Sequence, residues 1–187
     1  MVSQNVDGLF LRAGIPRSKI SELHGNFFLD ECSVCNCRFI RSTPSTTMGL
    51  KTSGPCRRQE RPCRGHWRDT ILDWEDDLPP KELQKAERYS NKADLCICLG
   101  TSLQIVPAAN LPFLCKRRSK TSLPGRVVIV NLQKTKYDHK ADLVIHDYID
   151  DVLVQLCKCL DIQIPLFRPE TDPTNRPIND ERVYIWK

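Results

Sequence analysis

The chain has 187 residues and a net charge of +5; 40% of its residues are hydrophobic and 27% are charged. This hydrophobic fraction excludes an intrinsically disordered chain, and the length supports one domain, with or without a small insert. No apolar run reaches the roughly 20 residues of a membrane span, and the first ten residues lack the pattern of a secretion signal. The ten cysteines therefore predict reduced thiols and a metal site in a soluble intracellular protein, rather than disulfide bonds.

Residues 1–69 show little regular periodicity. A turn at 13–16 and a short mixed run at 19–26 precede a polar stretch, 30–69, that contains five of the ten cysteines. A stretch of this composition cannot form a hydrophobic core by itself, so it needs a covalent or metal staple.

Residues 70–160 alternate between helical and strand patterns. Apolar residues at near-helical spacing after Pro79-Pro80 predict a helix that ends at about Lys92. Further helices are expected from about Pro107 to Lys116 and over 150–160. Three continuous apolar runs predict strands buried on both faces of a sheet, and they are 95–99, 126–130 and 142–146.

The strand–helix–strand order predicts an α/β fold in which a parallel sheet has helices on its faces. Ligands of such sheets bind beyond the carboxyl ends of the strands. Prolines at 165, 169, 173 and 177 predict an extended or disordered tail. We therefore expect one part made of 1–29 and 70–162, a metal module at 30–69 and a Pro-rich tail at 163–187.

The metal module contains a C-x2-C pair and, twenty residues later, a C-x6-C pair: Cys32, Cys35, Cys56 and Cys63. Two thiolates from each of two loops can close a tetrahedron about zinc, and four sulfur ligands leave no position for water. A zinc ion held in this way would be structural. Cys37 and His66 are alternative ligands, and a set of free surface thiols is the alternative to a metal site.

A group of amides, a carboxylate and an imidazole stands near the start of the chain: Gln4, Asn5, Asp7 and His24. An isolated histidine is more often a structural group than a catalyst. The order of motifs favours catalysis, because Q-N-V-D-G-L, E-L-H-G-N, C-x2-C with a second cysteine pair, G-T-S-L and V-N-L-Q resemble the sirtuins over about residues 3–162. The stretches 68–76 and 100–105 are similar to the sirtuin six branch of that family.

The resemblance implies a Rossmann-like parallel sheet, here a partial one, with a structural zinc module. It also implies an NAD-dependent protein-lysine deacylase, which releases nicotinamide and transfers the acyl group to ADP-ribose, with ADP-ribosyltransferase as a side activity. His24 matches the general base, and Asn5 and Asp7 match residues at the reacting centre. Matching cofactor-binding positions are Gln4, Asn5, Gly100, Thr101, Ser102, Asn131, Gln133, Tyr148 and Ile149.

Partners and location are also implied by the resemblance. The substrate would be an acylated lysine on histones or other proteins, in the nucleus and at chromatin. Trp74 matches a residue that lines the acyl-lysine tunnel, although a core tryptophan is the alternative interpretation. Basic runs at 57–64 and 116–118 could contact nucleosomal DNA, or they could be ordinary solvated surface that partly offsets the charge of zinc thiolates.

One part of the family pattern has no match in this sequence. Sirtuins carry a Gly-rich phosphate loop before the Q-N-V-D motif, and the eight glycines here include no G-x-G-x-x-G pattern. The chain thus resembles the C-terminal part of a sirtuin. A catalytically weak or inactive fragment that acts as a chromatin-binding or regulatory protein is the alternative function, and a zinc module with an unrelated sheet is a third interpretation.

We expect the 187-residue chain to bind NAD weakly and to turn it over little. A phosphate loop supplies more than one charge-assisted hydrogen bond, and the loss of two weakens binding by more than about a hundredfold. Nicotinamide release from NAD and an acetylated histone peptide measures this. A rate within about tenfold of a full-length relative would contradict the expectation.

Overall fold

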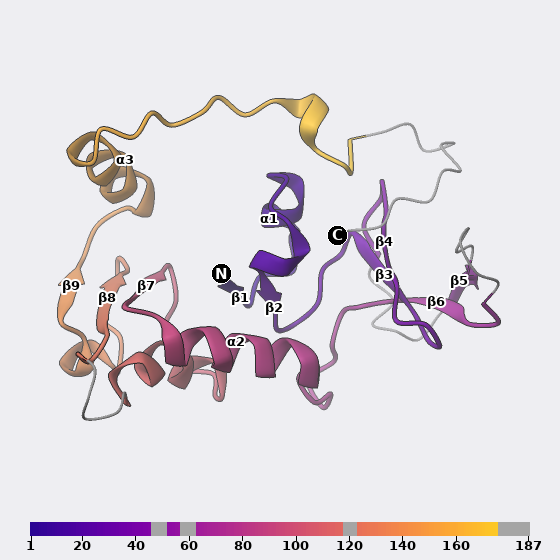
Figure 1. Ribbon diagram of the computed structural model, residues 1–187, viewed down its shortest axis with the longest axis horizontal. Helices are drawn as coiled ribbons and strands as arrows, with labels where there is room; N and C mark the ends of the chain where they lie inside the picture. Colours follow the sequence, from indigo (N-terminus) through magenta and orange to yellow (C-terminus); the bar gives the residue numbers. More distant parts are fainter. Residues whose placement is uncertain (46–51, 57–62, 118–122, 176–187) are drawn as a thin grey trace. The chain divides into compact units, whose positions relative to one another are not determined.

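The computed structural model describes residues 1–45, 52–56, 63–117 and 123–175. The chain divides into two compact units, Met1–Leu83 with Phe167–Lys187, and Gln84–Leu166 (Figure 1). The domain boundaries expected from the sequence stay a prediction. None of the helices in the described ranges is long and apolar enough to cross a membrane.

The first unit begins with a small parallel sheet. Strand β1 (Val2–Ser3) pairs with β2 (Ser21–Glu22), and helix α1 (Leu9–Arg12) and the 3-10 turn η1 (Arg17–Lys19) lie between them in the chain. Strands this short gain stability mainly from the packing around them. That packing is a cluster of fully or nearly fully buried side chains: Leu11, Ile20, Leu29 and Ile40.

The cysteine-rich stretch folds as a four-stranded antiparallel sheet of order β4-β3-β6-β5. The strands are β3 (Leu29–Cys32), β4 (Arg38–Ile40), β5 (Thr52–Pro55) and β6 (His66–Asp69). Its small core contains Cys32, Phe39 and Cys56, and the Phe39 and Trp67 rings stack with centroids 4.2 Å apart. The apolar content is as low as the sequence indicated, so the cysteines make up a large share of this core.

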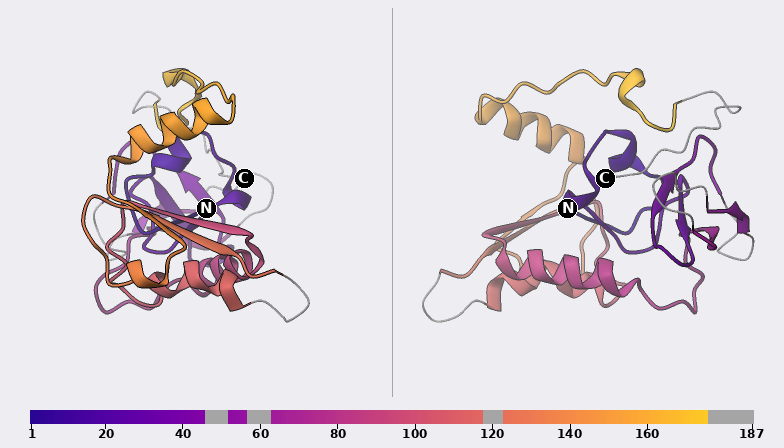
Figure 2. Two further views of the ribbon diagram at one scale, coloured as in Figure 1. Left: turned by 90° about the vertical axis from the view of Figure 1, so that its left-hand side faces the viewer. Right: turned by 45° about the vertical axis from the view of Figure 1, so that its right-hand side comes forward.

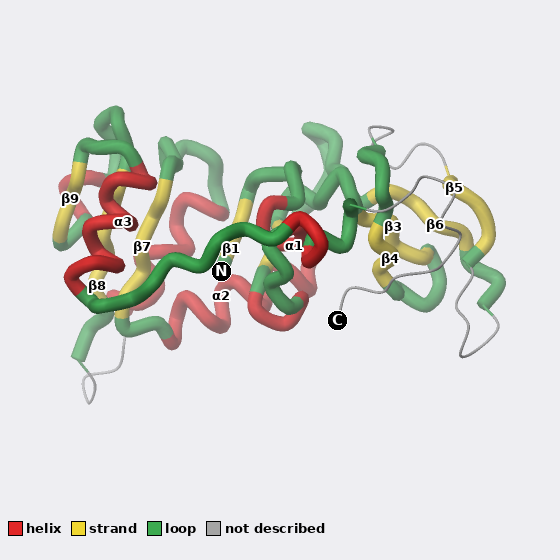
Figure 3. Tube along the Cα trace, turned by 90° about the horizontal axis from the view of Figure 1, so that it is seen from above, coloured by secondary structure: helices red, strands yellow, loops and turns green. Residues whose placement is uncertain are grey.

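The second unit contains a parallel sheet of order β7-β8-β9, in which the strands run side by side (Figure 3). They are β7 (Leu95–Leu99), β8 (Arg126–Val130) and β9 (Leu143–Ile145). Helix α2 (Pro80–Lys92) precedes the sheet and α3 (Ile149–Cys159) follows it. The α/β fold with a parallel sheet is therefore confirmed, and so are the first helix and the first two strands at the expected positions.

One face of this sheet carries the core of the second unit. The 3-10 helix η2 (Ala108–Arg117) packs against β7 and β8, and η2 and α3 lie on opposite sides of the sheet (Figure 2). Side chains of η2 and of both strands fill the space between them. The buried residues of this cluster are Cys98, Leu103, Ala109, Cys115, Val127 and Ile129.

One expectation about this unit is wrong. The 95–99 strand is not buried on both faces, because Leu95, Ile97 and Leu99 are 51%, 43% and 40% exposed. Only the side chains between them, including Cys98, face the η2 side. The helix expected from about Pro107 to Lys116 is confirmed as the 3-10 helix η2, and Pro112 inside it lacks the N–H that an α-helical hydrogen bond needs.

The remaining elements are short. The turn η3 (Asp138–Lys140) precedes β9, and η4 (Pro169–Thr171) is the one regular element that the structure describes after α3. The expected extended tail is thus confirmed for 163–168, whereas 169–175 form a turn with buried Asp172 and Thr174. The part of the tail from 176 onward lies outside the described residues.

The two faces of the second unit's sheet predict different responses to the same substitution. Ile129 is fully buried and Ile97 is 43% exposed on the opposite face. Ile129→Ala should lower the free energy of unfolding by about 2–5 kcal/mol, because it leaves a cavity, whereas Ile97→Ala should lower it by well under half as much. Urea unfolding of both variants beside the parent chain measures the difference. Equal losses would contradict the assignment of the buried face.

Candidate functional site

Parallel pairing of β1 and β2 brings together two residues of the first motif group. Gln4 follows β1 and His24 lies just after β2, so both leave the carboxyl ends of paired parallel strands. His24 Nδ1 lies 3.1 Å from the Gln4 carbonyl oxygen. A carbonyl only accepts hydrogen bonds, so this contact places the ring proton on Nδ1 and leaves the lone pair on Nε2.

The turn that carries His24 is fixed by a close backbone approach. Gly25 has φ +88°, and a Cβ atom there would lie 1.9 Å from the Thr70 carbonyl oxygen, so only glycine fits. The Thr70 hydroxyl accepts a hydrogen bond from the Asn26 amide and donates one to the Asn26 carbonyl, at 3.0 and 3.1 Å. The half-buried His24 thus precedes a turn that is fixed by the close packing of Gly25 and by the two hydrogen bonds of Thr70.

Asn5 and Asp7 are exposed beside this turn. The Asn5 amide donates to the Ser3 hydroxyl at 3.1 Å, and the Asp7 carboxylate accepts from the Leu9 amide at 3.0 Å. Both contacts join residues two positions apart, and neither uses the Asn5 side chain or the second oxygen of Asp7. The roles assigned to these two residues stay predictions.

Trp74 lies in a turn between β6 and α2 and is 96% exposed. The alternative interpretation of Trp74 as a core residue is therefore wrong. This exposure is compatible with a role in substrate binding, which stays a prediction.

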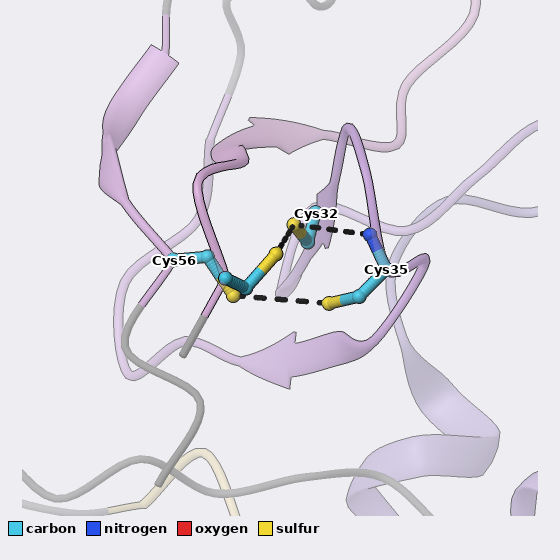
Figure 4. A group of neighbouring side chains, drawn as sticks. Cys32, Cys35 and Cys56 are labelled. Carbon is cyan, nitrogen blue, oxygen red and sulfur yellow. Dashed lines mark hydrogen bonds between the residues drawn. The ribbon is translucent and has the colours of Figure 1, made fainter. Parts of the chain in front are cut away.

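The four expected zinc ligands converge at one end of the antiparallel sheet. Figure 4 shows the sulfurs of Cys32, Cys35 and Cys56 turned toward one another, and with Cys63 all four sulfurs lie within 4.8 Å of each other. The pairs Cys32–Cys63 and Cys35–Cys56 are 3.6 and 3.8 Å apart. Tetrahedral zinc with Zn–S bonds of about 2.3 Å places its sulfurs about 3.8 Å apart. The geometry therefore fits a zinc ion.

Backbone contacts support the same cluster. The amides of Val34 and Cys35 point at the Cys32 sulfur, each at 3.5 Å. A Cβ atom on Gly65 would lie 2.3 Å from that sulfur, so glycine is required where the second loop passes the first. Amides directed at sulfur favour the thiolate form that binds metal.

The opposite pKa shifts of Cys35 and Cys63 show how strongly the neighbouring sulfurs interact. Burial opposes ionisation of Cys35, but the Cys37 amide and the neighbouring sulfurs outweigh it and lower the pKa of Cys35 to about 6. The Gly65 amide favours ionisation of Cys63, yet desolvation and the sulfurs of Cys32 and Cys35 outweigh this amide and raise its pKa. Four adjacent thiols cannot all ionise unless a positive ion compensates their charge, and zinc would do so.

The two alternative ligands lie outside this group. Among the described residues the metal-ligand group consists of the four cysteines alone. Cys37 packs against the cluster as a partly buried side chain, and His66 is exposed. Sequence spacing by itself could not decide this point, since both residues lie within a few positions of a ligand.

The second unit gathers the remaining cofactor-binding candidates at one edge of its sheet. Gly100 follows β7, and its amide donates to the Val130 carbonyl at 3.0 Å. Gly100 has φ +58°, and a Cβ atom there would lie 2.8 Å from the Ile149 side chain. Thr101 bonds locally, through its hydroxyl, to the Leu103 amide at 3.2 Å, and Ser102 is exposed.

The strand ends of β8 and β9 complete this edge. The Asn131 amide donates to the Ile145 carbonyl at 3.1 Å, and the Asn131 side chain donates to the Gln133 carbonyl at 2.7 Å. The exposed Tyr148 caps the start of α3. Hydroxyl, amide and backbone groups thus line the edge at which parallel sheets bind ligands.

The basic runs are only partly described. Arg57, Arg58, Arg61 and Arg118 lie outside the described residues. Lys116 pairs with Asp142 at 2.8 Å, which compensates its charge, and the neighbouring Arg117 is exposed.

Sequence reasoning missed the residues that hold the His24 turn. Thr70 lies 44 positions from Asn26, and a lone threonine after the cysteine module carries no sequence signal. Asn26 stood in the E-L-H-G-N motif without a role, yet it is fully buried and bonds to Glu22.

The fold and these motifs define a sirtuin-type protein, and comparison with known proteins agrees. The model of the Sir2 family matches residues 1–107. The chain belongs to the Sir2 family.

Named relatives cover most of this chain. It is 50% identical over 166 residues to NAD-dependent protein deacetylase SRT1 of Arabidopsis thaliana. The matched region covers 88% of this chain and 34% of the relative. It is 41% identical to NAD-dependent protein deacetylase Sirt6 of Drosophila melanogaster, over 94% of this chain and 56% of the relative. The chain therefore spans about a third to a little over a half of these relatives.

Solved structures are similar in fold. A Sir2 homolog–NAD complex matches with a TM-score of 0.65 and 28% sequence identity. The match covers 86% of this chain and 57% of the chain in that structure. Sir2 bound to acetylated peptide has a TM-score of 0.63 and 29% identity, with 87% and 63% covered.

The cysteine geometry predicts one tightly bound zinc ion per chain. Replacing Cys32 and Cys56 together with serine should abolish zinc retention and unfold the antiparallel sheet, because metal binding contributes folding energy in a region with so small a core. Elemental analysis and circular dichroism measure both effects. Cys37→Ser is the matched control and should retain zinc, so loss of zinc in that variant would contradict the assignment of ligands.

Proposed function

We propose that the protein is an NAD-dependent protein-lysine deacylase in which His24 is the general base. The observation that carries the proposal is the 3.1 Å contact between His24 Nδ1 and the Gln4 carbonyl. This contact fixes the ring orientation and leaves Nε2 able to accept a proton. The deacetylase names of the relatives and the motif order support the same activity.

The chain's own residues would contribute orientation and proton removal. NAD would supply the ribose to which the acyl group is transferred. Gln4 and Asn5 would orient that ribose, and His24 would take the proton from its hydroxyl group. The strand-end groups Ser102, Asn131 and Gln133 offer the hydroxyl and amide contacts that an adenosine needs.

The substrate in this proposal is an acylated lysine on a protein. Solved Sir2 structures carry acetylated and propionylated peptides, which supports this class. Exposed Trp74 would cover the acyl-lysine chain. Histones as targets, a nuclear location at chromatin and an ADP-ribosyltransferase side activity follow from the sirtuin six-like motifs and belong to the proposal.

A second function remains in competition with catalysis. A protein with the zinc module and the acyl-lysine surface, but with weak NAD binding, would act as a chromatin-binding or regulatory protein. Exposed Arg117 favours this alternative. NAD affinity separates the two functions, since only the enzyme needs the dinucleotide.

The role of His24 predicts a specific loss of activity. In a chimera that adds the Gly-rich phosphate loop of a relative to this chain, His24→Tyr should lower deacylation by about 10²–10⁴-fold, because a positioned base is removed. Nicotinamide release with an acetylated histone peptide measures the rate. His139→Tyr, at an exposed position in the second unit, is the control. Retention of more than half the activity by the His24 variant would end the assignment.

A further inference from the structure

The tail contains a buried acid that is anchored to the first unit. Asp172 is 6% exposed, and one of its oxygens accepts hydrogen bonds from the Thr174 amide and hydroxyl at 2.8 and 2.7 Å. The other oxygen accepts from Arg12 Nε at 3.1 Å. Burial opposes ionisation, but these bonds outweigh it and hold the pKa of Asp172 below its ordinary value. Residues 167–175, which we call the strap, therefore end in an ordered contact.

The partner of Asp172 is the last residue of α1. This helix has four residues, too few to be stable by its own hydrogen bonds, so its position depends on tertiary contacts. Leu11 supplies one of them in the buried cluster, and the Arg12–Asp172 ion pair supplies another. The turn η4 of the strap passes above α1 in the view of Figure 1.

Helix α1 begins where the candidate catalytic loop ends. Gly8 precedes it with φ +69°, and a Cβ atom there would lie 2.9 Å from Asn26 Oδ1 and 3.0 Å from the Phe28 ring. The Arg12 guanidinium stands over that same ring, 5.7 Å from its centroid. Asp172 thus bonds to Arg12, Arg12 stands over the Phe28 ring, and that ring leaves no room for a side chain at Gly8.

The loop at the start of these contacts touches the proposed base. Residues 4–7 connect Gly8 to β1, and the Gln4 carbonyl holds His24 Nδ1. Movement of α1 would therefore pass to the group that sets the tautomer of His24. Short segments with few buried contacts are also the ones that open first.

We propose that Asp172 is a positioning residue: through Arg12 the strap holds α1, and through α1 it fixes the Gln4 carbonyl against His24. The inference rests on the proposed role of His24 as base. It needs no NAD for its test, so its failure is distinct from a failure of the proposed activity.

The test compares backbone exchange and the His24 tautomer in the zinc-loaded chain. Asp172→Asn keeps the shape and the Thr174 contacts but turns an amide toward Arg12. The amides of Arg12 and Ala13 bond to the Gly8 and Leu9 carbonyls, and their hydrogen exchange should rise about tenfold, the effect of losing one charge-assisted bond. The ¹⁵N resonances of His24 should shift toward a mixture of the two tautomers.

Two further variants keep the result interpretable. Arg12→Gln, at a side chain 47% exposed, should fold and reproduce both changes. Glu170→Gln removes an exposed charge from the same strap and should change neither. The proposal is overturned if α1 exchange is unchanged in both test variants, if it rises equally in β3 and β6, or if α1 loosens while the His24 resonances stay in place.

Discussion

Parallel pairing between short strands is the constraint on which the candidate site residues of each unit depend. Parallel strands end at the same edge of a sheet, so residues that follow them meet however far apart they lie in the sequence. Gln4 and His24, twenty positions apart, meet in this way after β1 and β2. In the second unit the same rule gathers Gly100, Asn131 and Ile149. Strands of two residues cannot hold such an edge alone, and the buried cluster beneath them supplies the stability.

Buried charges support the first of these edges. Glu82, at the start of α2, pairs with Arg17 of η1 and with Arg38 of β4, and all three side chains are largely buried. Burial, and then repulsion from Arg38, lowers the pKa of Arg17 to about 10, so it stays charged at neutral pH. Loss of one partner from a buried pair leaves an uncompensated charge and costs about 3–5 kcal/mol. The ion pairs thereby fix the segment that leads into β2 and His24.

The cysteine cluster, with its zinc ion, stabilises the antiparallel sheet. Among the described residues its core is small, and Cys32 and Cys56 are two of the three buried side chains, so the sheet depends on a central ligand. Gly65 and Gly25 have the same structural role. At each of them a second chain segment comes so close that no side chain would fit. Both glycines stand next to a candidate functional group, the Cys32 sulfur in one case and His24 in the other.

The sequence by itself determined the elements whose pattern is local. The 80–92 helix, the strands at 95–99 and 126–130, the four cysteines and the family motifs are all readable within a few consecutive residues. Periodicity also predicted two buried faces for 95–99, and this was wrong because an apolar run does not reveal whether anything covers its second face. The third strand and the last helix lay within a residue of their expected ends.

Only the tertiary structure decided the contacts between distant segments. The four strands of the cysteine module, the bond from Thr70 to Asn26 and the ion pair of Arg12 with Asp172 join positions up to 160 residues apart. Each of these contacts depends on the path of the chain rather than on the neighbouring residues. A single threonine or aspartate forms no sequence pattern from which its partner could be predicted. Local chemistry therefore indicated the candidate site residues, and chain topology determined how they are held.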